Sequence, residues 1–209
     1  MEPDFGTMLF SAVLFSLLVL GFIWWRFGLT DMLVFIIVVG LFSAIMDFIS
    51  SFVVRNYEYP GQSPLWVFTY IFFGWMGMCG SCLFIGEEIL ANPGEDMLSQ
   101  HGLWWRVPLL TAVLAVVFDL FIDLVAVAAG YWVWFKPGRI YYGIPLLNYV
   151  GWFVLMFFAP LAWILIVRRR QWASYHKVGI AFGSLVPLFI VSVVTSLLFN
   201  GMFAALGLE

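Results

Sequence analysis

The chain has 209 residues, of which 64% are hydrophobic and only 10% are charged. Its mean hydropathy is +1.04, whereas an ordinary soluble domain is about 45–50% apolar and about 25% charged. The formal net charge is −3, so the chain offers no basic surface for nucleic acid. These values exclude a water-soluble enzyme, a disordered chain and a nucleic-acid-binding protein, and they indicate a protein embedded in a lipid bilayer.

Six apolar segments are each long enough to cross a bilayer as a helix, at about 20 residues per span. In chain order they are residues 8–27, 31–54, 64–86, 107–129, 143–167 and 179–206. The last segment is long enough to tilt or bend, and Pro187 and Gly201 are the candidate positions for a bend. The longest connection lies near 89–106. The sequence therefore predicts one all-α domain over residues 1–209, a polytopic integral membrane bundle of about six transmembrane helices.

The distribution of Lys and Arg predicts the orientation of this bundle. The connections after the first, third and fifth segments carry Arg26, Arg106, Arg168, Arg169, Arg170 and Lys177. Those after the second and fourth segments carry only Arg55, Lys136 and Arg139. Because Lys and Arg are enriched on the cytoplasmic side of membrane proteins, the first set is expected in the cytoplasm and both termini outside the cell membrane.

An internal repeat is the most informative feature of the organisation, because residues 47–75 echo residues 123–152. Asp47 matches Asp123, Pro60-Gly61 matches Pro137-Gly138, and Gly74-Trp75 matches Gly151-Trp152. The number of residues between the Pro-Gly pair and the Gly-Trp pair is identical in both copies. We expect spans two–three and four–five to be parallel repeats about an axis along the membrane normal. The alternative is that the two segments are unrelated and resemble each other because aromatic and glycine motifs are common in membrane proteins.

Three carboxylates fall inside predicted spans, namely Asp47, Asp119 and Asp123. A charge at the centre of a membrane helix costs at least about 2.5–3.5 kcal/mol, so such residues tend to be functional. Asp119 and Asp123 are four residues apart and share one helix face. Two like charges in a low dielectric do not both ionise easily, so one group is expected to keep its proton while the other serves as a base.

This pattern predicts a general acid–base pair, with Asp47 as a third candidate catalytic group from the other copy of the repeat. Two alternatives remain open for these acids. Each Asp could fix helix packing through hydrogen bonds to a neighbouring helix, or the acids could form a proton path or an ion site.

An aromatic-rich segment follows the acid pair, and its faces could stabilise a carbocation through the ring quadrupole. The same rings could equally form a belt at the membrane interface. Asn148 is placed to hold a water molecule or to cap a neighbouring group. The candidate substrate-binding residues are Tyr131, Trp132, Trp134, Tyr141, Tyr142, Asn148 and Trp152.

Histidine and cysteine give no metal or redox site in this sequence. His101 and His176 both lie in connections, so no haem or histidine-based metal centre is expected within the membrane. Cys79 and Cys82 form a C-x-x-C inside an apolar run, where we interpret them as small residues packed between helices. No cofactor and no metal are predicted.

Four further acids lie at or beyond the end of the third segment. Glu87 and Glu88 are adjacent and are predicted to be a solvated helix end. Glu95 and Asp96 follow in NPGED and are predicted to be loop or helix-start residues.

The run FDLFIDLVAVAAGYWVWFKPGRIYYGIPLLNYVGWF resembles the signature of the membrane carotenoid biosynthesis family, which includes carotenoid 1′,2′-hydratases such as the bisanhydrobacterioruberin hydratase-like proteins. The matching motifs are the D-x-x-x-D pair, G-Y-W-x-W, Y-Y-G-I-P-L-x-N-Y and G-W. The resemblance covers residues 119–153 well, and residues 47–75 echo it only weakly.

The resemblance implies a cofactor-free hydratase that adds water to a terminal C=C of a carotenoid or polyprenoid. A protonated acid would deliver H⁺ to give a tertiary carbocation, and a carboxylate-bound water would then add to it. By this resemblance Asp119 and Asp123 are the acidic pair, and the following motif supplies Tyr141, Tyr142, Asn148 and Trp152. The implied partners are a lipophilic carotenoid or polyprenoid substrate and the bilayer itself.

Two other functions remain as alternatives. The first is a non-enzymatic protein, either a small proton- or ion-coupled transporter or a lipid-binding membrane scaffold, which would use the same acids for coupling. The second is a carotenoid cyclase or double-bond isomerase, which shares the carbocation and differs in how it is quenched.

Overall fold

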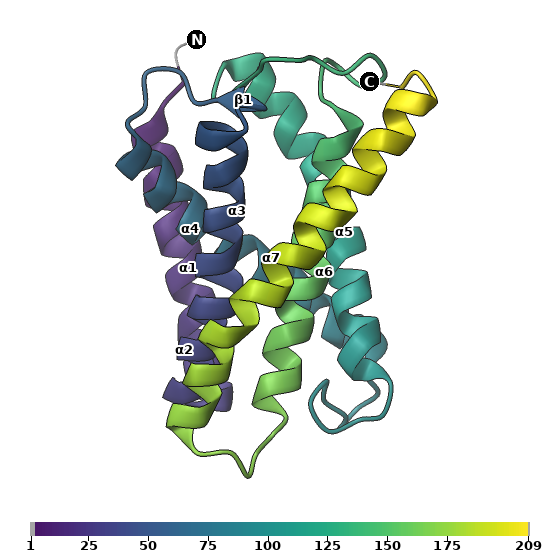
Figure 1. The fold of residues 1–209 in the computed structure, drawn as a ribbon. Coiled ribbons are helices and arrows are strands. Elements are labelled where there is room, and N and C mark those ends of the chain that lie inside the picture. Colours follow the sequence, from purple (N-terminus) through teal and green to yellow (C-terminus); the bar gives the residue numbers. More distant parts are fainter. Residues whose placement is uncertain (1–2, 209) are drawn as a thin grey trace.

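A computed structural model describes residues 3–208, and within them six helical segments are long and apolar enough to cross a membrane (Figure 1). They are α1 (Phe5–Phe27), the continuous segment Leu29–Val53, α4 (Pro64–Leu90), α5 (Leu103–Ala129), α6 (Leu146–Val167) and α7 (Ser174–Ala205). The predicted all-α bundle of six long apolar helices is therefore confirmed, with ends that differ by a few residues from those expected.

The second segment contains two π-helical stretches that the hydropathy pattern did not predict. In chain order it consists of α2 (Leu29–Phe35), η1 (Ile36–Leu41), α3 (Phe42–Phe48) and η2 (Ile49–Val53). Each π stretch makes i→i+5 bonds in place of i→i+4 bonds and so changes the direction of the side chains that follow it. Asp47 lies in α3, between the two stretches.

Close packing of α4 against its neighbours depends on small residues. A Cβ added at Gly40 in η1 would lie 2.7 Å from the Met76 sulfur of α4, and one at Gly80 in α4 would lie 2.2 Å from a Val19 methyl of α1. Cys79 and Cys82 are buried free thiols in the same helix. This placement agrees with the predicted packing role of the two cysteines.

The two ends of the bundle differ from each other in the structure of their connections. The start of α1 and the end of α7 lie at the same end of the bundle, at the top of Figure 1. At that end β1 (Tyr57–Glu58) and β2 (Val133–Trp134) form an antiparallel pair in which Tyr57 opposes Trp134. The sequence predicts helices only, and the short strand pair that joins two distant connections is a correction to that prediction.

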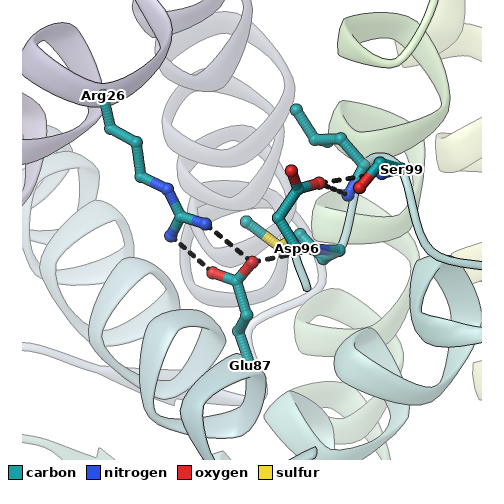
Figure 2. Close-up of polar contacts among 6 residues, drawn as sticks. Arg26, Glu87, Asp96 and Ser99 are labelled. Carbon is teal, nitrogen blue, oxygen red and sulfur yellow. Dashed lines mark hydrogen bonds and ion pairs between the residues drawn. The ribbon is translucent and has the colours of Figure 1, made fainter. Parts of the chain in front are cut away.

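At the opposite end Glu87 is tied into the protein rather than solvated (Figure 2). Its carboxylate accepts hydrogen bonds from both Arg26 terminal nitrogens, at 2.6 and 2.9 Å, and from the Met97 backbone N–H at 2.9 Å. Glu87 is only 4% exposed. The prediction of a solvated helix end is therefore wrong for Glu87, although the neighbouring Glu88 is exposed as predicted.

Glu95 and Asp96 lie in the connection between α4 and α5, as predicted, and both accept hydrogen bonds within it. Asp96 accepts hydrogen bonds from the backbone N–H groups of Leu98 and Ser99, both at 2.8 Å (Figure 2). Partial burial opposes these bonds, but they and the charge of Arg170 hold the pKa of Asp96 below its usual value. Glu95 accepts from Asn92 at 3.0 Å.

A second ion pair at this end lies inside the helical packing. Lys177 and His176 belong to α7, which begins at Ser174, and Arg106 belongs to α5, so the prediction that these three residues lie in connections is wrong. The Lys177 ammonium nitrogen is 2.8 Å from an Asp31 carboxylate oxygen and 3.3 Å from the Val167 carbonyl oxygen. The Trp163 indole donates to the Asp31 carbonyl at 2.9 Å. The cluster joins α2, α6 and α7.

We predict that Asp31→Ala or Lys177→Ala alone lowers the thermal stability of the protein in detergent micelles. Each change leaves one buried charge without its partner, which costs about 3–5 kcal/mol. The double variant Asp31→Leu with Lys177→Met removes both charges and should recover most of the loss. Equal destabilisation of the single and double variants, measured as Tm, would contradict this account of the pair.

The sidedness of the bundle remains a prediction that labelling can test. The buried thiols of Cys79 and Cys82 leave the background low, so a cysteine placed at exposed Arg170 reports one end and a cysteine at exposed Arg139 reports the other. With intact cells and an impermeant maleimide, we expect labelling of Arg139→Cys only. Labelling of Arg170→Cys from outside would invert the orientation.

Candidate active site

Asp119 and Asp123 lie on the buried face of α5. Asp119 is fully buried and Asp123 is 2% exposed. They continue a buried stripe of small residues on this helix at Ala112, Ala115 and Ala126, while the other face carries exposed apolar side chains. The i, i+4 spacing thus brings both carboxylates into the interior of the bundle, as the sequence predicted.

Asn148 of α6 joins the two carboxylates. Its side-chain nitrogen donates to Asp119 Oδ2 at 2.8 Å and to Asp123 Oδ2 at 2.5 Å. Asn148 lies in the first turn of α6, which starts after Pro145 in extended conformation. The first turn of α6 therefore faces the buried stripe of α5, and one amide group holds both acids in place.

One oxygen of the pair has no partner. Asp119 Oδ1 is a buried atom without a hydrogen bond to any described residue, and the hydroxyl oxygen of Tyr149, which follows Asn148 in α6, is buried and unpartnered as well. The two ion pairs among residues 3–208 lie at the opposite end of the bundle, so neither neutralises Asp119 or Asp123. The described part of the chain supplies the acid pair with neutral donors, the Asn148 amide and the nearby Trp132 indole, and with no cation.

Asp47 occupies a different environment, in which both of its oxygens accept hydrogen bonds from side chains. One oxygen accepts from the hydroxyl groups of Tyr57 and Tyr59, the latter at 3.5 Å, and the other accepts from the Trp75 indole at 2.9 Å. Tyr57 and Tyr59 belong to the connection after Val53. Burial, reinforced by the charge of Asp47, holds the pKa of both phenols well above its usual value, so they remain protonated donors.

The three acids gather at the end of the bundle that carries the strand pair. Asp47 is close enough to act electrostatically on Asp119 and Asp123, without a hydrogen bond to either among the described residues. The ring centroids of Trp75, which donates to Asp47, and of Trp152 in α6 lie 4.5 Å apart. No three His, Cys, Asp or Glu residues in the described ranges are grouped as a metal site requires.

Four of the predicted aromatic residues lie beside the acids. Trp152 contacts Trp75, and Trp132 lies next to the Asp123 carboxylate. Tyr141 donates its hydroxyl to the Leu120 carbonyl of α5 at 3.1 Å. Trp134 packs on the ring of Tyr57 at 4.7 Å, and so borders the Asp47 cluster.

Tyr131 and Tyr142 lie elsewhere. The Tyr131 hydroxyl is 3.2 Å from the backbone nitrogen of Asp4, and its ring contacts Phe5, so it fastens the start of α1. Tyr142 is 71% exposed and adopts a positive φ of 47° in the connection before α6. The structure does not bring these two predicted residues to the acid pair.

Four residues of this region were absent from the candidate set, namely Tyr57, Tyr59, Trp75 and Tyr149. Trp75 was marked by its match to Trp152 in the repeat. Tyr149 stands next to Asn148 within the motif itself. Tyr57 and Tyr59 carry no comparable signal, because their contact with Asp47 follows from the strand pair and not from a spacing in the sequence.

Comparison with known proteins adds one finding. A family model described as carotenoid biosynthesis protein matches residues 5–208, which is nearly the whole chain and includes every element of the site. No curated protein and no solved structure matches the chain.

Proposed function

Since the chain belongs to the carotenoid biosynthesis protein family, we propose that it is a membrane-embedded, cofactor-free hydratase that adds water to a terminal C=C of an acyclic carotenoid or polyprenoid. The observation that carries the proposal is the buried pair Asp119 and Asp123, joined by the Asn148 amide and without a cation. Hydration of an alkene by acid–base chemistry needs a proton donor and a proton acceptor next to each other.

The surroundings of the pair favour one proton shared between two carboxyl groups. Two ionised carboxylates side by side repel each other strongly in a low dielectric, and burying each charge has its own cost. Neutral donors such as the Asn148 amide and the Trp132 indole cannot offset two negative charges. With one proton on the pair, one group is an acid and the other a base at the same time.

The proposed reaction balances with water as the only co-substrate. The protonated carboxyl group gives its proton to the less substituted carbon of the terminal C=C, which leaves a tertiary carbocation. A water oxygen forms the C–O bond with that carbon, and the extra proton passes from the new oxonium to the ionised carboxylate. The pair ends with one proton, so the enzyme is regenerated without exchange of protons with bulk water.

The position of the pair suits a reaction at the end of a long polyene. At 1.5 Å per residue, Asp123 lies roughly 9 Å and Asp119 roughly 15 Å from the end of α5 at Ala129. Because α5 has 27 residues and is about 40 Å long, it exceeds a hydrocarbon layer of about 30 Å, so Asp123 lies toward one edge of that layer and Asp119 deeper within it. A substrate dissolved in the bilayer reaches them with its end group, and Trp132 and Trp152 offer ring faces to a cation there.

We assign Asp47 a positioning role. Three donors already bind its two oxygens, so neither oxygen lacks a protein partner as Asp119 Oδ1 does. Through Tyr57 and Trp75 this acid fixes the strand pair and α4 next to the α5–α6 site.

We also propose that residues 47–75 and 123–152 are copies of one unit related by a twofold axis. Tyr57 and Trp134 stand three residues before the matching prolines, and they oppose each other in the strand pair. Glu58 opposes Val133, and the contact that a twofold axis would relate to it is the 3.0 Å hydrogen bond from the Phe135 N–H to the Asn56 carbonyl. An experimental structure in which these contacts are not related by one twofold rotation would contradict the repeat.

The proposed repeat places the chemistry in its second copy. At the matching positions the first copy has Ser43 and Ile71 where the second has Asp119 and Asn148. Only the second copy therefore combines two acids and their bridging amide.

The test is pigment analysis in a host that makes acyclic carotenoids. Wild type should yield products heavier by one water, and Asp119→Asn or Asp123→Asn should each reduce them by about 10²–10⁴-fold, because either change removes the positioned acid or base. Asn keeps the volume and the hydrogen bonding of Asp, so the variants should still fold and elute as wild type in gel filtration.

The matched control is Glu88→Gln, which alters an exposed acid at the other end of the bundle and should leave the yield unchanged. Normal amounts of hydrated product from both Asn variants would show that the pair is structural. Isomerised or cyclised products of unchanged mass from wild type would favour the cyclase or isomerase alternative.

A further inference from the structure

Two buried polar atoms, one in the acid pair and one on Tyr149, have no hydrogen-bond partner among the described residues, and one can accept a hydrogen bond while the other can donate. Asp119 Oδ1 is an acceptor, whereas the Tyr149 hydroxyl both donates and accepts. The other Asp119 oxygen is held by Asn148, so Oδ1 is the oxygen left to meet a ligand. Tyr149 follows Asn148 directly in the first turn of α6.

Tyr149 lies close enough to both acids to interact with them electrostatically. The neighbouring Tyr141, whose ring centroid is 6.2 Å from that of Tyr149, already gives its hydroxyl to the Leu120 carbonyl. Of these two phenols, Tyr149 is the one whose hydroxyl is available.

Buried polar atoms without a protein partner are costly, and native proteins satisfy them with ordered water or a ligand. A water molecule bound inside a protein needs two or more polar partners. It can donate one hydrogen to Asp119 Oδ1 and bond to the Tyr149 hydroxyl, with a lone pair left to attack carbon.

We propose that Tyr149 is a water-binding residue of the site, which together with Asp119 Oδ1 holds the water molecule that attacks the carbocation. This inference rests on the proposed hydratase function. The oxygen of that water forms the C–O bond, one of its protons passes to the carboxylate pair, and the phenol is unchanged at the end of the step.

This role of Tyr149 concerns only one of the two steps at the acid pair, the addition of water and not the protonation of the C=C. Protonation of the C=C needs only the acid, and a cation that meets no water returns a proton from a neighbouring carbon to the carboxylate and restores an alkene. When the acid proton comes from D₂O, that return leaves deuterium in the recovered alkene. Tyr149→Phe should therefore impair hydration and spare the exchange.

The experiment uses the full-length protein in lipid vesicles with an acyclic carotenoid in D₂O, and mass spectrometry of both the hydrated product and the recovered alkene. We expect Tyr149→Phe to lower hydrated product about 10- to 100-fold, as loss of one hydrogen bond to a reacting group does. Deuterium in the recovered alkene should match or exceed the wild-type amount. Tyr175→Phe, 72% exposed at the opposite end, is the matched control and should behave as wild type.

Folding is monitored by Tm, which Tyr149→Phe should not lower, because the change removes a hydroxyl without a protein partner. Wild-type hydration by this variant would overturn the inference, and so would loss of exchange together with hydration at an unchanged Tm. If wild type itself neither hydrates nor exchanges, the proposed function fails first and takes the water site with it.

Discussion

The interaction on which the rest of the site depends is the single amide group that holds two buried carboxylates. Asn148 donates to both Asp119 and Asp123 from another helix, in a part of the bundle where the described chain provides no cation. In the hydrocarbon region of a bilayer such a pair cannot rely on bulk water for its charge. The pair therefore has to be satisfied by its immediate neighbours, and this requirement fixes how α5 and α6 face each other.

The contrast between Asp47 and Asp119 shows how one residue type can take two roles. Asp47 accepts from two phenols and one indole and has no oxygen to spare. Asp119 has an oxygen that is buried and free. An acid whose two oxygens both have protein donors stabilises the packing around it, whereas an acid with an unpartnered oxygen can receive a ligand.

The sequence predicts the local features of this protein and misses the contacts between distant segments. Hydropathy locates the six helices, and the spacing of Asp119 and Asp123 places both on one face, because each depends only on residues in one segment. The buried state of Glu87 and the pairing of Lys177 with Asp31 depend on helices that come together from far apart in the chain. A terminal Glu or Lys looks solvated until its partner helix is placed.

The strand pair illustrates the same limit. Tyr57 and Trp134 are 77 residues apart, and each lies in a stretch of only two paired residues. No periodicity can be read from so short a strand. The sequence therefore does not predict the contacts of Asp47 with Tyr57 and Tyr59, although the match of Trp75 to Trp152 in the repeat does single out Trp75.

The central claim is that the two acids share one proton, and infrared difference spectroscopy of the purified protein at neutral pH tests it most directly. The spectrum of wild type minus the Asp119→Asn, Asp123→Asn double variant should contain the C=O stretch of one protonated carboxyl group and the bands of one ionised carboxylate. Perturbation of that C=O band by Asn148→Leu would locate it at the bridged pair. A difference spectrum with two ionised carboxylates and no protonated carboxyl band would contradict the account.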